Sequence, residues 1–273
     1  MAGNEKHKAK GFFAKREEFL NRAKKQVKQA ISSPDNLLIQ SVGAIDELNR
    51  SANLLFERLS EWYGMHFPEL KVSDNSKYVK VVLELDRKNP DSKKLEEILG
   101  PYGREVAQKA ISSSGADFSQ RDIARVRSLA LQIQSLWKLR DEIESYQAQV
   151  AQEVCPNLSH IAGPHLAAKL VAHAHGLSRL SSFPSSTIQV LGAEKALFKH
   201  LKSGSKPPKH GIIFQHPLIS TSPKKARGKI ARALSAKLAI ASKADAITHN
   251  FIADKLKAEF DAQAKKILSK YRS

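Results

Sequence analysis

The chain has 273 residues, with 45 lysines and arginines against 27 aspartates and glutamates, which gives a formal net charge of +18 at pH 7. Hydrophobic residues make up 41%, enough for a core, so the chain is not merely a disordered basic tail. Aromatic residues are few, while alanine, lysine and leucine abound, which favours helices over a β-sandwich or barrel. The single cysteine, Cys155, excludes an intrachain disulfide and a zinc site built on several cysteines.

The sequence also lacks the signals of export and membrane insertion. No run approaches the roughly 18 apolar residues that a membrane-spanning helix needs. Residues 1–10 are polar and basic, without the apolar centre of a secretory signal. We therefore expect a soluble protein of the cytoplasm, with no membrane partner.

The first segment, residues 1–34, is rich in lysine and has apolar residues at helical spacing between positions 12 and 31. This spacing predicts a short amphipathic helix after a basic tail. Pro34 marks the end of the segment.

Two long stretches, 38–62 and 119–154, place apolar residues three and four positions apart, and the first of these seams ends at Trp62. Such seams are typical of helices that pack along their length as coiled coils. A helix over 119–154 would be roughly 50 Å long, too long to be buried in one compact globule. We predict an antiparallel hairpin whose tip, residues 67–118, is broken into short pieces by prolines and serines. The predicted coiled-coil interface consists of Leu38, Ile45, Leu48, Leu55, Leu59, Val126, Ile133, Leu136 and Ile143.

Pro156 ends the second long helix, because a proline cannot continue it, and the composition then shifts toward alanine, histidine and lysine. We place domain boundaries so that a basic tail with a short helix (1–34) precedes a coiled-coil hairpin (35–155) and a globular helical domain (156–273). Helices are predicted in the last domain at about 158–180, 193–202, 223–242 and 250–271. The predicted fold class is all-α.

The charge pattern of residues 196–244 points to a polyanion as partner. This stretch contains no carboxylate, and its charged side chains are Lys199, Lys202, Lys206, Lys209, Lys224, Lys225, Arg227, Lys229, Arg232, Lys237 and Lys243. Charge of one sign repels itself in a compact state unless a partner neutralises it. Nucleic acid is the commonest candidate, because each lysine or arginine that meets a phosphate releases condensed counterions.

The sequence Gly192-Ala193-Glu194-Lys195 is predicted to lie where an extended segment turns into a helix. The N–H groups at such a helix start, together with the helix dipole, could receive a phosphate, with Lys195 nearby. The alternative is an ordinary helix cap, which Glu194 favours.

The helix that begins near Pro223 places Lys225, Lys229 and Arg232 on one face, opposite an apolar face. A basic stripe of this kind is typical of a helix lying along a phosphate backbone, although a solvated charged face is the alternative. Histidines in the same zone could stack on unpaired bases. The predicted nucleic-acid contacts are Gly192, Ala193, Glu194, Lys195, Lys199, His200, Lys206, Lys209, His210, Gln215, His216, Lys224, Lys225, Arg227, Lys229 and Arg232.

No constellation of catalytic or metal-binding residues is evident. The sequence has no phosphate-binding P-loop, no GxGxxG after a strand, no GxSxG and no HExxH. The histidines of the basic zone lack the cysteines and acids that usually complete a metal site. We therefore expect a protein that is not an enzyme and that uses no metal or cofactor.

Several stretches together resemble the Nop domain: CPNL at 155–158, LVAHA at 170–174, FPSSTIQVLGAEKALF at 183–198 and RGKIARAL at 227–234. EWYGMHFPEL at 61–70 resembles the end of that family's first coiled-coil helix. The resemblance covers roughly residues 35–271. It is strongest to archaeal core proteins of box C/D guide-RNA particles, and weaker to the spliceosomal members of the family.

This resemblance implies a hairpin that self-associates as a coiled coil, giving a homodimer. It also implies a C-terminal domain that grips a kink-turn of box C/D guide RNA already bound by a small ribosomal-type protein. The particle would position a fibrillarin-type methyltransferase for guided 2′-O-methylation. Carried over by position, the turn at 192–195 and the helix around Arg227, Lys229 and Arg232 would meet the RNA and the small protein together.

One feature departs from the family's pattern. Archaeal members usually begin with a separate N-terminal domain that docks fibrillarin, whereas here only the short helix at 12–31 precedes the coiled coil. Either the chain is a shortened form or it is a natural variant without that domain, and direct recruitment of fibrillarin is not expected from these residues.

The sequence is also compatible with other functions. The chain could be a splicing-type or general structured-RNA-binding coiled-coil protein without a role in methylation. It could also be a structural coiled-coil protein whose charge serves an acidic protein or a membrane surface. An RNA-modifying enzyme would need a cofactor pocket that no motif indicates.

Overall fold

The structure is a computed structural model that describes residues 16–28 and 31–271. Within these residues every regular element is a helix and no strand occurs, so the predicted all-α fold class is confirmed. Residues 16–28 are helical and expose Phe19, Leu20 and Val27. The rest of the helix predicted over 12–31 falls partly on positions 12–15 and 29–30, outside the described residues. Among the described helices, none combines the length and the apolar character needed to cross a membrane.

The chain divides into two compact units. One consists of Met1–Val42 and Tyr146–Ser273, and the other of Gly43–Ser145. The long helices α2 (Pro34–His66) and α6 (Gln120–Val154) each belong in part to both units. The domain boundaries predicted at 34/35 and 155/156 stay predictions, because the units divide within these helices.

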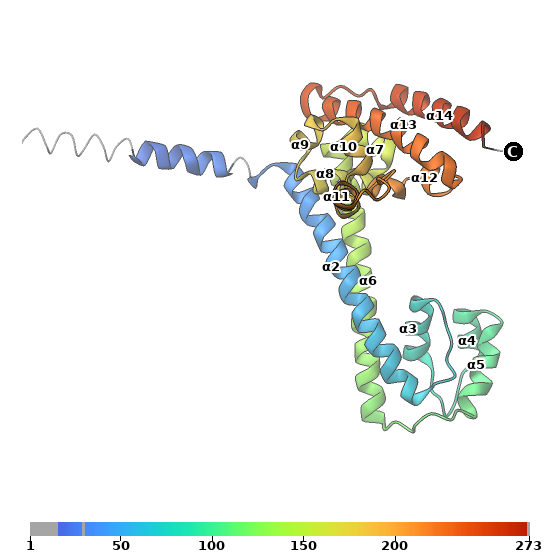
Figure 1. Ribbon diagram of the computed structural model, residues 1–273. Helices are drawn as coiled ribbons and strands as arrows, with labels where there is room; N and C mark the ends of the chain where they lie inside the picture. The colour runs from blue at the N-terminus through green and yellow to red at the C-terminus, as the bar shows by residue number, and fades with distance from the viewer. Residues whose placement is uncertain (1–15, 29–30, 272–273) are drawn as a thin grey trace, which may run out of the picture. The chain divides into compact units, whose positions relative to one another are not determined.

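In the unit of residues 43–145, α2 and α6 lie against each other in opposite directions, and three short helices lie beside them (Figure 1). These are α3 (Asn75–Glu84), α4 (Ser92–Leu99) and α5 (Tyr102–Ile111). Asp74 and Asp91 start the first two, because their carboxylates accept the N–H groups of Lys77 and of Lys93 and Lys94. The core between the helices includes Leu59, Tyr63, Val126 and Ile133, all at most 1% exposed.

The predicted seam faces the interior at most of its positions. Leu38, Ile45, Leu59, Val126 and Ile133 are buried, while Leu48, Leu55, Leu136 and Ile143 are partly exposed. The expectation that the first seam ends at Trp62 is wrong: Trp62 is 37% exposed, and Tyr63 lies in the core at 1%. The next buried position after Leu59 is therefore four residues on, at Tyr63, and not three. An α-helix has 3.6 residues per turn, so steps of three and of four residues both keep a side chain on the same face.

The loops at the end of this hairpin are held by two charged side chains. The Arg87 guanidinium donates to the carbonyls of His66, Gly115 and Ala116 and pairs with Asp117. Position 115 requires glycine, because the Cβ of any other residue would overlap the carbonyl of His66. The second is Glu69, whose carboxylate accepts from the Ser113 hydroxyl at 2.6 Å and from the Ser114 N–H and hydroxyl at 2.8 Å.

The second unit consists mostly of short helices packed around one long one (Figure 1). In chain order they are α7 (Pro156–Ala162), α8 (Pro164–Ala174), α9 (Leu177–Ser182), α10 (Ser185–Val190), α11 (Glu194–Ser203), the 3₁₀ turn η1 (Ile212–Gln215), α12 (Pro217–Ser220), α13 (Lys224–Lys243), the π-helical segment η2 (Ala244–Thr248) and α14 (Ala253–Ser269). The single helix predicted over 158–180 is wrong. It is split at Gly163 (φ 84°), which Pro164 follows, and again at Gly176 (φ 132°).

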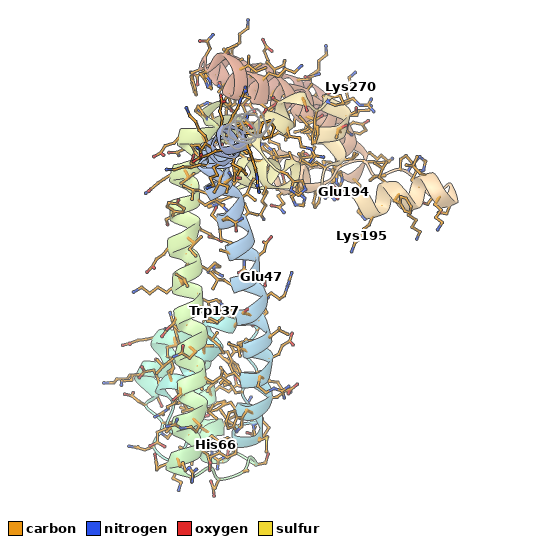
Figure 2. The ribbon with its side chains drawn as sticks, turned by 90° about the vertical axis from the view of Figure 1, so that its left-hand side faces the viewer. Glu47, His66, Trp137, Glu194, Lys195 and Lys270 are labelled. Atoms are coloured by element: carbon orange, nitrogen blue, oxygen red, sulfur yellow. The ribbon has the colours of Figure 1, made fainter. Side chains whose placement is uncertain are left out.

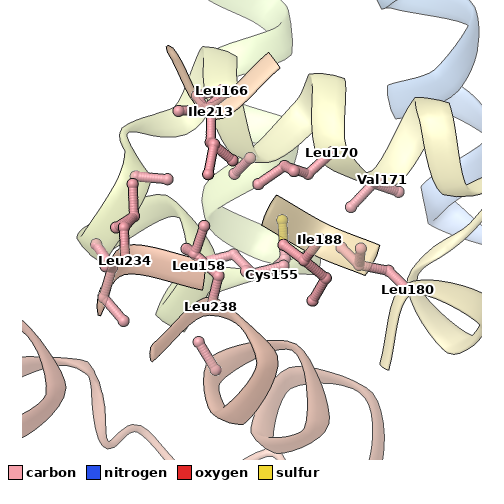
Figure 3. Close-up of a cluster of buried hydrophobic side chains, with 14 of the residues drawn as sticks. Cys155, Leu158, Leu166, Leu170, Val171, Leu180, Ile188, Ile213, Leu234 and Leu238 are labelled. Atoms are coloured by element: carbon pink, nitrogen blue, oxygen red, sulfur yellow. The ribbon is translucent and has the colours of Figure 1, made fainter. Parts of the chain in front are cut away.

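The core of this unit forms around α13. Leu234 and Leu238 of α13 pack with Leu158, Leu170 and Ile188, all of them at most 1% exposed (Figure 3). Cys155 lies in the same core at 0% exposure, and burial raises the pKa of its thiol to about 12. The lone cysteine therefore serves packing and is unreactive at neutral pH.

One buried carboxylate ties the start of α7 to η2. Asp245 is 2% exposed and accepts the backbone N–H groups of Asn157 and Leu158 at 3.0 Å and the Asn157 amide at 2.7 Å. Burial raises the pKa of Asp245, and these donors act in the opposite direction by stabilising the charged form. Asn157 also accepts the N–H of Ile252 at 2.7 Å, so the same hydrogen-bond network fixes the residues just before α14.

Replacing Asp245 with alanine should lower the free energy of unfolding by about 2–3 kcal/mol, because two buried backbone N–H groups lose their acceptor. Urea unfolding followed by circular dichroism measures the change. Asp254→Ala is the matched control: its side chain is 79% exposed, lies 3.1 Å from His160, and should contribute less than about 1 kcal/mol. Equal losses in the two variants would contradict the role given to Asp245.

The Glu69 carboxylate should make stability depend on acid pH. Burial acts to raise the pKa of Glu69, but hydrogen bonds from Ser113 and Ser114 outweigh it and lower the pKa from 4.5 to about 2. A carboxyl with a depressed pKa stabilises the fold above its unfolded pKa, and the contribution is lost as pH falls from about 4.5 toward 2.

We therefore expect Glu69→Gln to lower the urea midpoint at neutral pH and to flatten its fall in this acid range. Glu57→Gln, at an exposed position of α2 in the same unit, is the control. An acid profile of Glu69→Gln identical to that of the unchanged protein would refute the assignment.

Candidate nucleic-acid interface

The turn at 192–195 lies between two helices and is bound to a loop from further along the chain. The N–H of Gly211 donates to Gln189 O and that of Ile212 to Leu191 O, both at 2.8 Å. The Gln189 amide donates to Lys209 O at 2.7 Å. The segment before the turn was expected to be extended, but it forms helix α10 and ends at Val190.

Two glycines allow this close approach. Gly192 adopts a φ of 81°, and a Cβ there would overlap the side chain of Ile212. A Cβ at Gly211 would overlap the Leu191 carbonyl. The turn and the 209–212 loop therefore form one continuous surface.

Glu194 caps the turn. Its carboxylate accepts the N–H of Gly192 at 2.6 Å, as expected of an acid in the first turn of a helix. The Gly192 N–H that might have received a phosphate is thus taken by the chain itself. Lys195, beside it, is exposed.

Helix α11 extends away from the rest of its unit, with Glu194 and Lys195 at its beginning (Figure 2). None of its residues is buried. Phe198 and Leu201 are 67% and 74% exposed, and Lys195, Lys199 and Lys202 are also exposed. The helix thus presents both an apolar and a basic surface. Phe198 and Leu201 are not among the contacts predicted from the sequence, although two large apolar residues in a strongly basic short helix indicate a binding role.

Arg227 holds the start of α13 through part of its guanidinium. Its guanidinium donates to Ser222 O at 2.8 Å and to Ser220 O at 3.0 Å, and it lies over the Phe214 ring at 5.2 Å. These charge-assisted hydrogen bonds fix the loop before the helix. They use Nε and Nη2, and the side chain is partly exposed, so the contact of Arg227 with nucleic acid stays a prediction.

The predicted base-stacking residues are also engaged within the protein. His216 is 9% exposed, accepts the Leu218 N–H at 3.3 Å, and packs edge-on against Phe260. Because the ring is buried, it cannot stack on a base, and burial also lowers its pKa. His210 stacks on Phe214 with ring centres 4.7 Å apart, and burial likewise lowers its pKa.

The other two polar candidates have partners as well. The ring of His200 forms a hydrogen bond with Ser205 O. Gln215 accepts from the Lys169 ammonium at 3.0 Å. The His200 contact lies within the loop that follows α11, whereas the Gln215 contact joins η1 to α8 and leaves Gln215 exposed. The lysines and arginines are the stronger candidates for a phosphate ligand.

A smaller set of cations therefore remains. Lys195, Lys199, Lys206, Lys209, Lys224, Lys225, Lys229 and Arg232 are exposed, and within the described residues none of them forms a salt bridge. The side chain of Lys209 lies over Gly228, 3.4 Å from the place of a Cβ, so the 209–212 loop joins the 192–195 turn to the start of α13. Lys237 is not part of the set, since Glu259 of α14 neutralises it at 2.5 Å.

The interface contains no feature of a metal centre. Within the described residues, no three histidine, cysteine, aspartate or glutamate side chains group in a way that could hold a metal ion. What the arrangement can do chemically is bind phosphates through lysine and arginine and bind a second surface through the apolar residues of α11.

The sequence profile of the Nop family, described as "snoRNA binding domain, fibrillarin", matches residues 44–269. The chain belongs to the Nop family. The match covers all of α13 and α14 as well as the turn at 192–195 and most of the helical hairpin.

Relatives of this Nop protein occur in archaea and eukaryotes. It is 42% identical over 252 residues to a protein of Methanocaldococcus jannaschii described as an uncharacterized NOP5 family protein, a match that covers 91% of this chain and 61% of that protein. It is 40% identical over 230 residues to nucleolar protein 58 of Coccidioides immitis, covering 82% and 38%. It is 37% identical over 237 residues to nucleolar protein 56 of Dictyostelium discoideum, covering 84% and 44%. The chain thus spans between about two fifths and three fifths of these relatives.

A solved structure shares the fold of the Nop protein. It is described as the crystal structure of a fibrillarin/Nop5p complex and superposes with a TM-score of 0.54 at 25% sequence identity. The match covers 94% of this chain and 78% of that one.

Arg227→Ala should lower the free energy of unfolding by about 1–3 kcal/mol, because two carbonyls and the Phe214 ring lose their partner. Lys225→Ala, two residues earlier on the same helix, should change it by no more than about 0.5 kcal/mol. Thermal unfolding of the two variants compares a structural cation with a surface one. A loss as small for Arg227→Ala as for Lys225→Ala would mean that the guanidinium contacts are not formed in solution.

Proposed function

We propose that this Nop protein is a non-enzymatic scaffold of a box C/D-type ribonucleoprotein. In this proposal it binds kink-turn RNA together with a small ribosomal-type kink-turn-binding protein, and it supports guide-RNA-directed 2′-O-methylation. The observation that carries the proposal is the single surface formed by the 192–195 turn, the 209–212 loop and the start of α13, with exposed cations and a protruding apolar helix beside it. The family profile, described as a snoRNA-binding domain, supports the same conclusion.

The RNA half of the proposal rests on the exposed cations. Lys209, Lys225, Lys229 and Arg232 lie on or beside the start of α13 and have no salt bridge among the described residues. Lysine and arginine supply affinity for phosphates without reading sequence. Recognition would therefore depend on RNA shape, as is usual for structured RNA.

The protein half rests on α11. Phe198 and Leu201 expose apolar side chains on a helix with no buried residue, next to the turn that carries Lys195. Apolar side chains held out into solvent on a rigid element are typical of a protein-binding surface. A small protein already seated on the RNA would cover them, which makes RNA and protein binding cooperative.

Two further partners belong to the proposal. The fibrillarin/Nop5p likeness supports a fibrillarin-type methyltransferase, which would carry out the methyl transfer that no motif of this chain supports. Self-association through α2 and α6 is proposed from the seam, where Leu48, Leu55, Leu136 and Ile143 remain partly exposed. Apolar seam positions that are only partly covered along a long helix favour pairing with another helix.

Gel-shift titration tests the RNA and protein halves together. We expect binding to a kink-turn RNA that becomes sharply tighter when the small kink-turn-binding protein is added, because two surfaces then engage at once. Equal binding to a straight RNA duplex of the same length would favour general RNA binding and count against the proposal. Preference for anionic vesicles or acidic peptides would favour the purely structural alternative.

Salt dependence locates the interface. The triple variant Lys225→Ala, Lys229→Ala, Arg232→Ala should reduce the slope of log K against log salt by about two to three units, because up to three phosphate contacts are lost. The matched control removes three exposed lysines from the other unit, Lys77, Lys80 and Lys93. A slope reduced only in the control would place the RNA on the hairpin unit.

A further inference from the structure

We infer that the RNA-binding surface continues from α13 onto the C-terminal half of α14, where Lys266 and Lys270 bind the phosphate backbone. No residue of α14 belonged to the contacts predicted from sequence. This inference rests on the proposed function and extends it to a second helix.

Helices α13 and α14 lie side by side in opposite directions. The Lys237 ammonium meets Glu259 at 2.5 Å, and the Lys229 ammonium lies 5.3 Å from the centre of the Tyr271 ring. Residues later in α14 therefore lie beside residues earlier in α13. The end of α14, where Figure 2 labels Lys270, comes next to the basic first half of α13.

Charge is distributed unevenly along this pair. The carboxylates of α14, Asp254, Glu259 and Asp261, all lie in its first half, and two of them meet cationic or titratable partners: Glu259 meets Lys237, and Asp254 lies 3.1 Å from His160. From Ala262 to Tyr271 the chain has three lysines and no acid. Charge is thus balanced at one end of the pair and uncompensated at the other.

Helical spacing places the relevant lysines on one flank. Lys266 and Lys270 follow Glu259 by seven and eleven residues, two and three turns of an α-helix, so they lie on the flank that faces Lys237 of α13. Both are exposed, and neither forms a salt bridge within the described residues. On α13, Lys225, Lys229 and Arg232 are exposed on one face, and Lys229 reaches α14 through the Tyr271 ring.

These five cations lie on the exposed surfaces of the adjoining ends of the two helices, and we call them the ridge. Tyr271 contributes a half-buried ring that holds the Lys229 ammonium by a cation–π contact. Five neighbouring cations without an acid among them repel one another, and a polyanion relieves that repulsion. A nucleic-acid backbone suits the ridge, because it carries closely spaced phosphates over a length that can meet cations on both helices.

The test compares two double variants of the full chain that remove the same charge from the same helix. The double variant Lys266→Ala, Lys270→Ala removes the two cations that α14 contributes to the ridge. In Lys255→Ala, Lys257→Ala two exposed lysines are removed from the half of α14 that contains its carboxylates. All four positions are exposed, so both variants should unfold at the temperature of the unchanged protein.

We expect Lys266→Ala, Lys270→Ala to reduce the slope of log K against log salt by about one to two units on kink-turn RNA, and the control to leave it nearly unchanged. An unchanged slope in the ridge variant would overturn the inference. Equal reductions in both variants would also overturn it, since they would report the overall charge of the protein. A loss of binding to poly-L-glutamate as large as the loss of binding to RNA would assign the ridge to an acidic protein instead.

The two proposals fail in different ways. If the unchanged protein bound kink-turn RNA and straight duplex equally, the proposed function would fall, and a slope reduced on the duplex by the ridge variant would still support the inference. If kink-turn binding were selective but insensitive to Lys266 and Lys270, the function would stand and the ridge would not. Absence of binding to either RNA would refute both.

Discussion

The candidate interface depends on the backbone pairing between the 209–212 loop and the turn that ends α10. Two hydrogen bonds join Gly211 to Gln189 and Ile212 to Leu191, and the glycines at 192 and 211 permit an approach that a Cβ would block. This pairing joins residues some twenty positions apart into one surface and brings Lys209 over α13. Without it, the turn, the loop and the helix would be three separate basic segments. Rigid support of this kind lowers the entropy lost when a ligand binds.

The fold leaves only some of the many basic side chains without an acidic partner. Residues 196–244 contain no acid, but acids from other parts of the chain pack against them, and Glu259 neutralises Lys237 in this way. Arg227 donates to two carbonyls and stacks on Phe214, which makes it part of the scaffold. The cations that remain are those for which the fold provides no acidic partner. That property, more than net charge, marks a surface for an anionic ligand.

Each unit uses charged groups with several hydrogen-bond partners to fix its loops. Arg87 donates hydrogen bonds to the carbonyls at the tip of the hairpin. Asp245 accepts hydrogen bonds from the N–H groups at the start of α7, and its partner Asn157 binds the segment before α14. A charged group with several hydrogen-bond partners holds loops that have little apolar surface to bury. Both groups are therefore structural, although isolated charged residues in loops are often candidates for a functional role.

The sequence alone determined the helical class, the inward positions of the seam such as Leu59 and Ile133, and the basic character of α13, because periodicity and composition are local properties. It misplaced Trp62 relative to Tyr63, since three- and four-residue steps fit a helix equally well. It could not show that His216 is buried or that Arg227 holds the loop before α13, because their partners lie elsewhere in the chain or depend on the path of a loop. Only the tertiary structure decided which cations stay unpaired, and only the pairing of α13 with α14 brought Lys266 and Lys270 next to them. Charge neutralisation depends on distance in space, and sequence order does not record that distance.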